Sequence, residues 1–211
     1  MKSVLCFGDS NTWAYNPETG TRYPYEIRWT SVLQKALGDS WTIIPEGFNG
    51  RTTVFSDPFM PYRNGLEFFP AIIGSHYPLD ILIIMLGTND TKSVFDLPVH
   101  NITGGLEALI KAARGKAYGI NGGDPKILIV SPAIITEGDQ NKAVFDLRQF
   151  QGSAEKSIQF GAACKALAQK TLCSFFDASK IAFSSSIDGI HLTPESHKTL
   201  GLELAALIKR L

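Results

Sequence analysis

The chain has 211 residues, of which 44% are hydrophobic, and its 20 lysines and arginines balance 20 aspartates and glutamates. This length is enough to bury one sizeable core, so we expect a single domain spanning residues 1–211. A net charge of zero gives no electrostatic reason to expect nucleic acid or an anionic membrane as a partner. A small, uncharged or modestly polar substrate fits this composition better.

The first residues and the cysteines bear on the compartment. The apolar run Val4–Phe7 ends at Gly8, which makes it too short for a signal sequence or a membrane span. The three cysteines Cys6, Cys164 and Cys173 show no paired metal-ligand spacing, and an odd number favours reduced, buried thiols. We therefore expect a cytoplasmic protein with its cysteines in the core.

Short apolar runs alternate with helical patterns along the chain. The runs are continuous, which predicts strands covered on both faces, and they lie at Val4–Phe7, Trp41–Ile44, Ile81–Leu86, Ile127–Val130 and Cys173–Phe176. Helical spacing covers Trp29–Leu37 with Gly38 as C-cap, about Gly105–Arg114, Ala154–Lys170, and a last helix with Thr193 as N-cap and Pro194 at its first position. This alternation predicts a doubly wound α/β sandwich.

Two stretches fit no regular element. Asn16–Arg28 and the segment Thr53–Pro70, which is rich in proline and aromatic residues, both follow polar motifs at strand ends. Such loops lie at the carboxyl edge of a parallel sheet, which is where ligands bind in this architecture. We expect both stretches to border a binding site.

A serine follows the first strand directly, in the motif Gly8-Asp9-Ser10-Asn11-Thr12. Backbone N–H groups of a following turn or helix can face an anion at such a position, as a nucleophilic serine requires. An ordinary N-capping role for Ser10 explains the same motif equally well. The motif alone leaves both interpretations open.

A nucleophilic serine needs a base, and His191 stands out among four histidines because Asp188 lies three residues before it in a polar loop. The carboxylate could accept from one imidazole nitrogen while the other nitrogen faces the serine. Asp177 also ends a strand and could reach the same edge, but we favour Asp188 for its spacing. We expect surface or satisfied roles for the other histidines, His76, His100 and His197, with His197 on the exposed side of the last helix.

Donors for an oxyanion could come from two glycine-containing turns after strands, residues 47–51 and 87–90. Taken singly, each is more simply an ordinary βα turn. The spacing of carboxylates and histidines indicates no metal site, and no glycine-rich nucleotide loop follows the first strand.

Taken together, these motifs resemble the conserved blocks of the SGNH (GDSL-type) hydrolase family: Gly-Asp-Ser-Asn at residues 8–11, a glycine turn after the second strand, Gly-Thr-Asn-Asp at residues 87–90 and Asp-x-x-His at residues 188–191. The blocks span nearly the whole chain. One branch, the small bacterial arylesterases and acyltransferases, is more similar still, at residues 5–10, 28–29, 46–47, 51–53, 84–92, 130–132, 176–177 and 188–191.

The resemblance implies a flavodoxin-like three-layer α/β/α sandwich with a central five-stranded parallel sheet, and it requires no cofactor. It also implies that Ser10 is the nucleophile, His191 the general base and Asp188 the residue that orients the base. The oxyanion hole would comprise the backbone N–H groups of Ser10 and Gly50 and the side chain of Asn89.

The chain departs from the branch beside the nucleophile. Asn11 stands where many relatives carry Leu, and Tyr15 where a member with transfer activity carries Trp. We expect Asn11, Tyr15, Asn49 and Ile190 to border the substrate. A polar Asn11 and bulky neighbours, namely Trp13, Tyr15, Phe48 and Phe55, predict a short acyl pocket.

The expected function is therefore hydrolysis of short-chain aryl or alkyl esters through an acyl-serine, with acyl transfer to alcohols as a further capability. The same triad could instead serve a carbohydrate O-deacetylase or an acyl thioesterase. A ligand-binding module that uses the strand-end pocket without catalysis is the alternative from another class. The resemblance also implies a homo-oligomer, and the balanced charge leads us to expect neither nucleic acid nor membrane as a partner.

Overall fold

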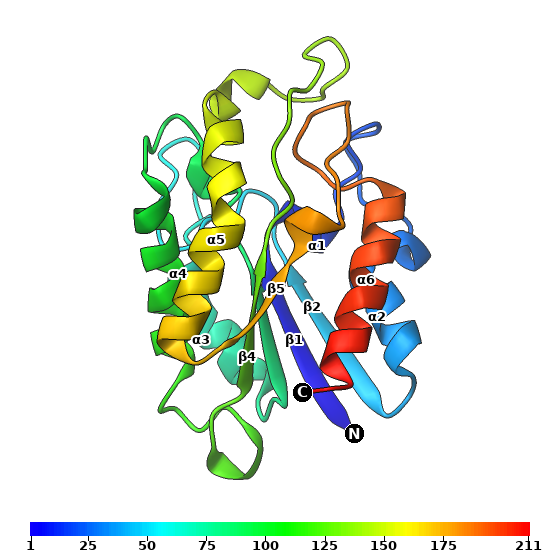
Figure 1. The fold of residues 1–211 in the computed structure, drawn as a ribbon, viewed down its shortest axis with the longest axis vertical. Coiled ribbons are helices and arrows are strands. Elements are labelled where there is room, and N and C mark those ends of the chain that lie inside the picture. The colour runs from blue at the N-terminus through cyan, green and yellow to red at the C-terminus, as the bar shows by residue number, and fades with distance from the viewer.

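The computed structural model describes residues 1–211 and contains one parallel sheet in the order β2-β1-β3-β4-β5 (Figure 1). Its strands are β1 Lys2–Gly8, β2 Trp41–Gly47, β3 Ile81–Met85, β4 Lys126–Ser131 and β5 Ser174–Asp177. Each strand lies at one of the predicted apolar runs. The order is that of a flavodoxin-like sheet, as the resemblance implied.

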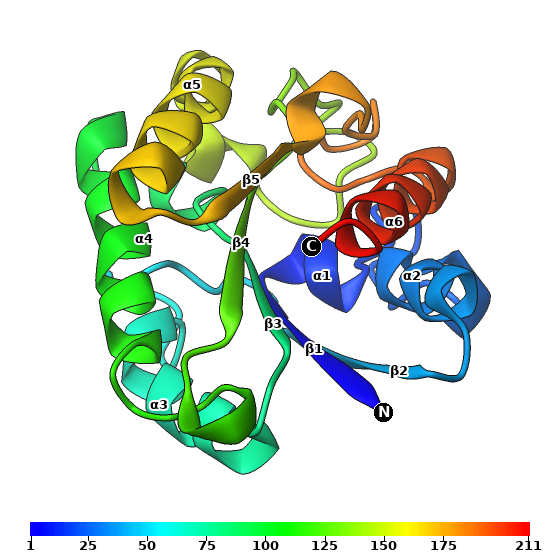
Figure 2. The ribbon, with the colours of Figure 1, turned by 60° about the horizontal axis from the view of Figure 1, so that its bottom comes forward.

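Helices cover both faces of the sheet. On one face lie α2 (Trp29–Leu37) and α6 (Pro194–Ile208), while α3 (Gly65–His76), α4 (Val99–Ala113) and α5 (Ser153–Thr171) cover the other (Figure 2). The three-layer α/β/α sandwich is thus confirmed. Short segments complete the chain: α1 (Ser10–Trp13) and the 3₁₀ turns η1 (Tyr25–Ile27), η2 (Asn89–Thr91), η3 (Ile120–Gly122), η4 (Leu147–Phe150) and η5 (Ala178–Lys180).

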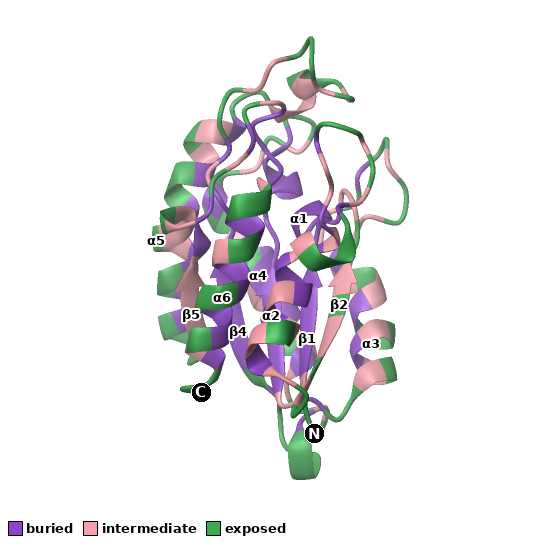
Figure 3. Ribbon diagram, turned by 90° about the vertical axis from the view of Figure 1, so that its right-hand side faces the viewer, coloured by how far each residue is buried: buried purple, intermediate pink, exposed green.

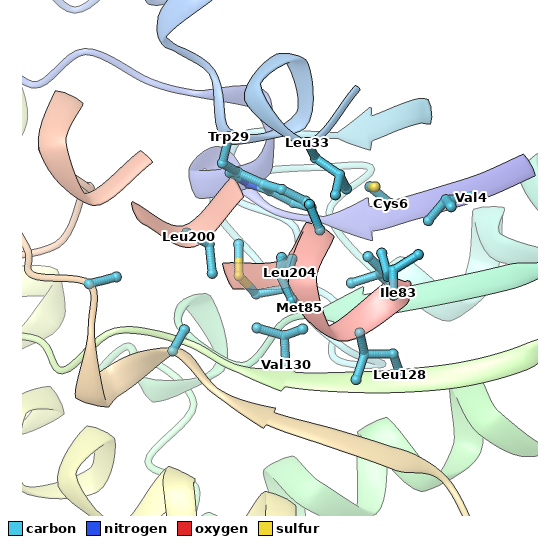
Figure 4. Close-up of a cluster of buried hydrophobic side chains, with 14 of the residues drawn as sticks. Val4, Cys6, Trp29, Leu33, Ile83, Met85, Leu128, Val130, Leu200 and Leu204 are labelled. Atoms are coloured by element: carbon cyan, nitrogen blue, oxygen red, sulfur yellow. The ribbon is translucent and has the colours of Figure 1, made fainter. Parts of the chain in front are cut away.

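The core is divided by the sheet, because successive strand side chains point to opposite faces. Strand residues such as Cys6 and Ile83 join α2 and α6 in one cluster, where Trp29 is fully buried (Figure 4). Their neighbours Leu5 and Ile84 join the cluster under α3, α4 and α5. Burial is deepest in the sheet and on the inward faces of the helices (Figure 3), which explains why the strand runs are continuously apolar.

Helix termini follow the predicted chemistry. The Thr193 hydroxyl accepts a hydrogen bond from the Ser196 N–H at the start of α6, with Pro194 at the first helical position. Gly38 ends α2 at φ 78°, a conformation that favours glycine. None of the helices combines the length and apolarity needed to cross a membrane.

The prediction of an irregular segment from Thr53 to Pro70 is wrong in its last third, where α3 begins at Gly65. Asn64 caps this helix by accepting from the Glu67 N–H. Pro70 lies inside α3 and is exposed, so tertiary packing of Phe69 and Ile73 holds a helix that proline disfavours.

The expected surface position of His197 is also wrong. Its side chain is completely buried, its Nδ1 accepts from the Trp29 N–H at 3.3 Å, and its ring meets Tyr23 edge-on. His197 lies on the same face of α6 as Leu200, Leu204 and Ile208, all of them buried. Burial, with a smaller contribution from the charge of His191, lowers its pKa to about 3.

The cysteines divide into two groups. Cys6 and Cys164 are buried as expected, and burial raises the pKa of the Cys164 thiol to about 12. Cys173 is only half-buried, at the residue before β5, and its sulfur accepts from the Arg114 guanidinium. Cys173 thus packs against the core cluster under α3, α4 and α5 but lies at its edge, less buried than expected.

Candidate active site

The candidate site lies where β1, β2 and β3 end together. Gly8, the last residue of β1, pairs with Gly47 at the end of β2 and with Met85 at the end of β3. Ser10, Gly50 and Asn89 follow these three strand ends within four residues of each. The parallel register thus brings three separate sequence motifs to one edge of the sheet.

Ser10 is the first residue of the short helix α1. Asp9 caps this helix by accepting from the Asn11 N–H at 2.9 Å, so the N-capping role considered for Ser10 belongs to Asp9. A Cβ on Gly47 would stand 2.1 Å from the Trp13 nitrogen, so the absence of a side chain there lets the end of β2 lie against α1. The Ser10 hydroxyl therefore does not cap the helix.

A continuous hydrogen-bonded chain links Ser10, His191 and Asp188. His191 Nε2 lies 2.9 Å from the Ser10 Oγ, and His191 Nδ1 lies 2.5 Å from Asp188 Oδ2. All three residues are buried, with Asp188 2% exposed. This is the geometry in which a carboxylate holds an imidazole ready to take a proton from a serine.

Asp188 is anchored by more than the imidazole. Its Oδ1 accepts from the Ile190 N–H at 2.9 Å and from the His191 N–H at 3.0 Å. Gly189, at φ 72°, makes the tight turn between them, and a Cβ there would stand 2.0 Å from the Thr136 carbonyl oxygen. Burial raises the pKa of Asp188, but the hydrogen bonds and the charge of His191 outweigh it and hold the pKa below its ordinary value.

Asp177, the alternative acid, has other partners. Its Oδ1 accepts from the Ser131 hydroxyl at 2.8 Å and the Ser179 hydroxyl at 2.6 Å, and Lys180 lies 3.6 Å from its Oδ2. These contacts brace the end of β5. The structure therefore brings Asp188, and not Asp177, to His191.

The candidate oxyanion donors come from three different loops. The Asn89 side chain is buried and donates to the Arg51 carbonyl oxygen at 3.2 Å, which connects the loop after β3 to the loop after β2. The Gly50 N–H donates no hydrogen bond within the chain. Ser10 supplies the third N–H, at the start of α1.

Sequence comparison adds the family to this geometry. The model of the GDSL-like lipase/acylhydrolase family matches residues 6–199. The chain belongs to this family. Its fold superposes on the native aryl esterase of M. smegmatis with a TM-score of 0.93, at 36% identity over the whole of both chains.

Two further relatives of this GDSL-like hydrolase act on carbohydrates by name. A carbohydrate acetylesterase from Sinorhizobium meliloti is 39% identical over 100% of this chain and 99% of its own, with a TM-score of 0.91. An acetylxylan esterase of Xylanibacter ruminicola is 31% identical over 53% of this chain, and the match covers 22% of that relative's length. Family and neighbours together identify a carboxylic ester hydrolase.

Two contacts that brace the site of this hydrolase escaped the sequence analysis. The Arg51 guanidinium donates to the carbonyl oxygens of Gly8 and Glu46, tying the ends of β1 and β2, and burial lowers its pKa to about 10. Asp90 accepts from the N–H and hydroxyl of Thr53, and burial raises its pKa to about 6. Both residues lie at the ends of the glycine-containing turns 47–51 and 87–90, but Arg51 reaches Gly8, and Asp90 reaches Thr53, about 40 residues away in sequence.

The residues expected to border the substrate differ in burial and in their partners. The Tyr15 ring lies 4.3 Å from the His191 ring, between centroids, and Phe145, absent from the sequence-based expectations, meets His191 edge-on at 5.9 Å. Asn49 is half-buried, and its Oδ1 has no hydrogen-bond partner. Ile190 is buried, and the Asn11 amide is hydrogen-bonded to the His191 loop.

Proposed function

We propose that this GDSL-like hydrolase cleaves short-chain acyl esters through an acyl-serine intermediate on Ser10. The observation that carries the proposal is the hydrogen-bonded chain from Asp188 through His191 to the Ser10 hydroxyl, at 2.5 and 2.9 Å. A serine hydroxyl is a weak nucleophile unless a base removes its proton, and this chain supplies the base and its orienting carboxylate.

In the proposed reaction the Ser10 Oγ attacks the ester carbonyl carbon while its proton moves to His191 Nε2. The carbonyl oxygen becomes an oxyanion, held by the N–H groups of Ser10 and Gly50 and the Asn89 amide. His191 then gives the proton to the departing alkoxide, which leaves as the alcohol. Water, deprotonated by His191, attacks the acyl carbon, the bond between this carbon and the Ser10 Oγ breaks, and His191 returns the proton to Oγ as the acid leaves. An alcohol in place of water would give a transferred ester.

The aromatic side chains around His191 support short acyl groups. Tyr15 and Phe145 both contact the imidazole, and Phe145 also packs against Phe150. Each added methylene of an acyl chain needs apolar space, and rings already occupy the surroundings of the base. Aromatic leaving groups can still stack on these rings at the edge of the site.

A carbohydrate O-deacetylase is the second candidate, and a polar cleft near the end of η2 favours it. The cleft has a volume of about 450 Å³ and is lined by Asp57, Phe59, Met60, Lys92, Ser93, Val94, Asp146, Arg148 and Gln149. Lys92, which lines this cleft, follows Asn89 by three residues, and in this candidate function the hydroxyl groups of an acetylated sugar would bind among these side chains. The acetylesterase from Sinorhizobium meliloti supports the same candidate.

The test of the proposed function is turnover of an aryl acetate by the wild-type protein and by Ser10→Ala. A sulfonyl fluoride should abolish turnover and add one label, on the peptide containing Ser10. Ser75→Ala, which removes an exposed serine in α3, is the matched control and should retain full activity. Labelling of Ser31 or Ser131 instead, or activity in Ser10→Ala, would overturn the assignment, and an absence of turnover across ester lengths would favour a binding module.

The choice between the two substrate classes needs a separate comparison. An acetylated xylo-oligosaccharide and an aryl acetate are hydrolysed side by side by the wild-type protein and by Arg148→Ala. Arg148 is largely exposed in the polar cleft. A deacetylase should lose kcat/KM for the sugar alone, whereas an aryl esterase should show the same kcat/KM in both proteins.

A further inference from the structure

The Asn11 side chain is hydrogen-bonded to the backbone on both sides of His191. Its Oδ1 accepts from the Leu192 N–H at 2.9 Å, and its Nδ2 donates to the Ile190 carbonyl oxygen at 3.3 Å. Asn11 is 4% exposed, so both hydrogen bonds are shielded from water. Its amide is thereby occupied within the chain.

The arrangement imitates the pairing of parallel strands. In a parallel ladder, one residue bonds to the carbonyl before and the N–H after the residue opposite it. The Asn11 amide takes this place opposite His191, bonding to Ile190 before it and Leu192 after it. Such pairing fixes the backbone dihedrals at His191 and thus the direction in which its side chain leaves the loop.

We call the Asn11 side chain with its two hydrogen bonds to Ile190 and Leu192 the clamp. The backbone of Asn11 is in turn fixed next to the nucleophile. Asn11 follows Ser10 in the chain, its N–H donates to Asp9 Oδ1, and its carbonyl accepts from the Trp29 indole at 3.1 Å. Trp29 is fully buried in the core. A single residue therefore joins the turn that carries Ser10 to the loop that carries His191.

We propose that Asn11 is a positioning residue that sets the register between Ser10 and His191, an inference that rests on the proposed function. Asp188 fixes the imidazole from one side, and the Ser185 N–H holds the His191 carbonyl at 2.7 Å. Neither connects the His191 loop to the nucleophile turn. Without Asn11 the loop keeps its internal bonds, but the 2.9 Å contact between Nε2 and Oγ is no longer fixed from the serine side.

The test is Asn11→Leu, which keeps a side chain of similar length and removes both hydrogen bonds. Because misplacing a catalytic group by a fraction of an ångström slows the chemical step, kcat for an aryl acetate should fall about 10- to 100-fold, with KM changed less than about threefold. The proton NMR resonance of the His191 Nδ1–H should broaden or shift. A substitution that only destabilised the fold would not lower kcat while leaving KM nearly unchanged. It would also not change the His191 resonance alone.

Gln34→Leu is the matched control. The Gln34 amide likewise bridges backbone groups, accepting from Ile43 N–H at 2.9 Å and donating to the Trp41 carbonyl at 2.9 Å, but it lies between α2 and β2, away from the site. Its removal should lower the melting temperature and leave kcat and the His191 resonance unchanged. If Asn11→Leu fails to fold, Asn11→Ser replaces it in the test. The serine hydroxyl cannot reach both the Ile190 carbonyl and the Leu192 N–H, so kcat should again fall, but by less than in Asn11→Leu.

The outcomes separate this inference from the proposed function. Inactive Ser10→Ala together with a fully active, folded Asn11→Leu or Asn11→Ser would overturn the clamp and leave the acyl-serine mechanism standing. An active Ser10→Ala would overturn the mechanism itself. A kcat loss in Asn11→Leu equalled by Gln34→Leu would also overturn the clamp, since a bridging amide far from the site would then matter as much.

Discussion

Replacing Asp188 by asparagine perturbs the proposed triad at one atom. An asparagine can still accept from the Ile190 and His191 N–H groups through its Oδ1, which directs its NH₂ group at His191 Nδ1. Nδ1 must then accept, and the imidazole proton moves to Nε2, facing the Ser10 hydroxyl. An Nε2 that already carries a proton cannot take one from Ser10.

The expected decrease in kcat of Asp188→Asn has two causes. The wrong tautomer must be reversed before each turnover, and the carboxylate charge that stabilises the imidazolium is gone. Because the hydrogen bonds and charge of His191 hold the pKa of Asp188 below its ordinary value, Asp188 is ionised at neutral pH and this charge is present in the wild-type protein. Together these losses should lower kcat about 10⁴-fold, equivalent to about 5 kcal/mol in the barrier.

The assay is kcat for an aryl acetate at mildly alkaline pH, with circular dichroism as the test of folding. Asp177→Asn is the control, since an asparagine there can still accept from Ser131 and Ser179, and kcat should stay within about threefold of wild type. A larger loss at Asp177 than at Asp188 would reverse the choice of acid. A folded Asp188→Asn that retains a tenth of wild-type kcat would refute the tautomer argument.

Three further predictions test other parts of the molecule. Asn89→Ala should lower kcat about 10²–10³-fold with a smaller change in KM, and an effect on KM alone would mean that Asn89 only holds the substrate. Acetyl and propionyl esters should exceed octanoyl esters in kcat/KM, whereas a preference that rises with chain length would indicate an open lipid-accepting groove in place of the ring-lined site. Because the folded chain holds His197 at a pKa of about 3, against an ordinary 6.5, the unfolded chain binds the extra proton between these values and stability falls as pH decreases through this window. His197→Asn, which keeps an acceptor for Trp29, should be less stable at neutral pH but should lose up to about 1.4 kcal/mol per pH unit of that dependence; urea midpoints measured against pH that run parallel to wild type would contradict the burial argument.

The amino-acid sequence by itself determined the five strands, the helices other than α3, and the three residues of the proposed triad. Continuous apolar runs such as Ile81–Leu86 specify strands buried on both faces, and Thr193-Pro194 specifies a helix start, because these patterns depend on residues close together in the chain. The Asp-x-x-His spacing is local in the same way. It was therefore sufficient to favour Asp188 over Asp177 as the partner of His191.

Only the tertiary structure decided the contacts between distant segments. His197 is buried because α6 packs on α2, α3 forms despite Pro70 because Phe69 and Ile73 enter the core, and Phe145 reaches His191 from a loop without periodicity. The Asn11 amide bonds to Ile190 and Leu192 across about 180 residues of sequence. Such pairings depend on strand order and helix packing. Local sequence patterns carry no information about these contacts, because the contacts form only when the folded sheet brings its strand ends together.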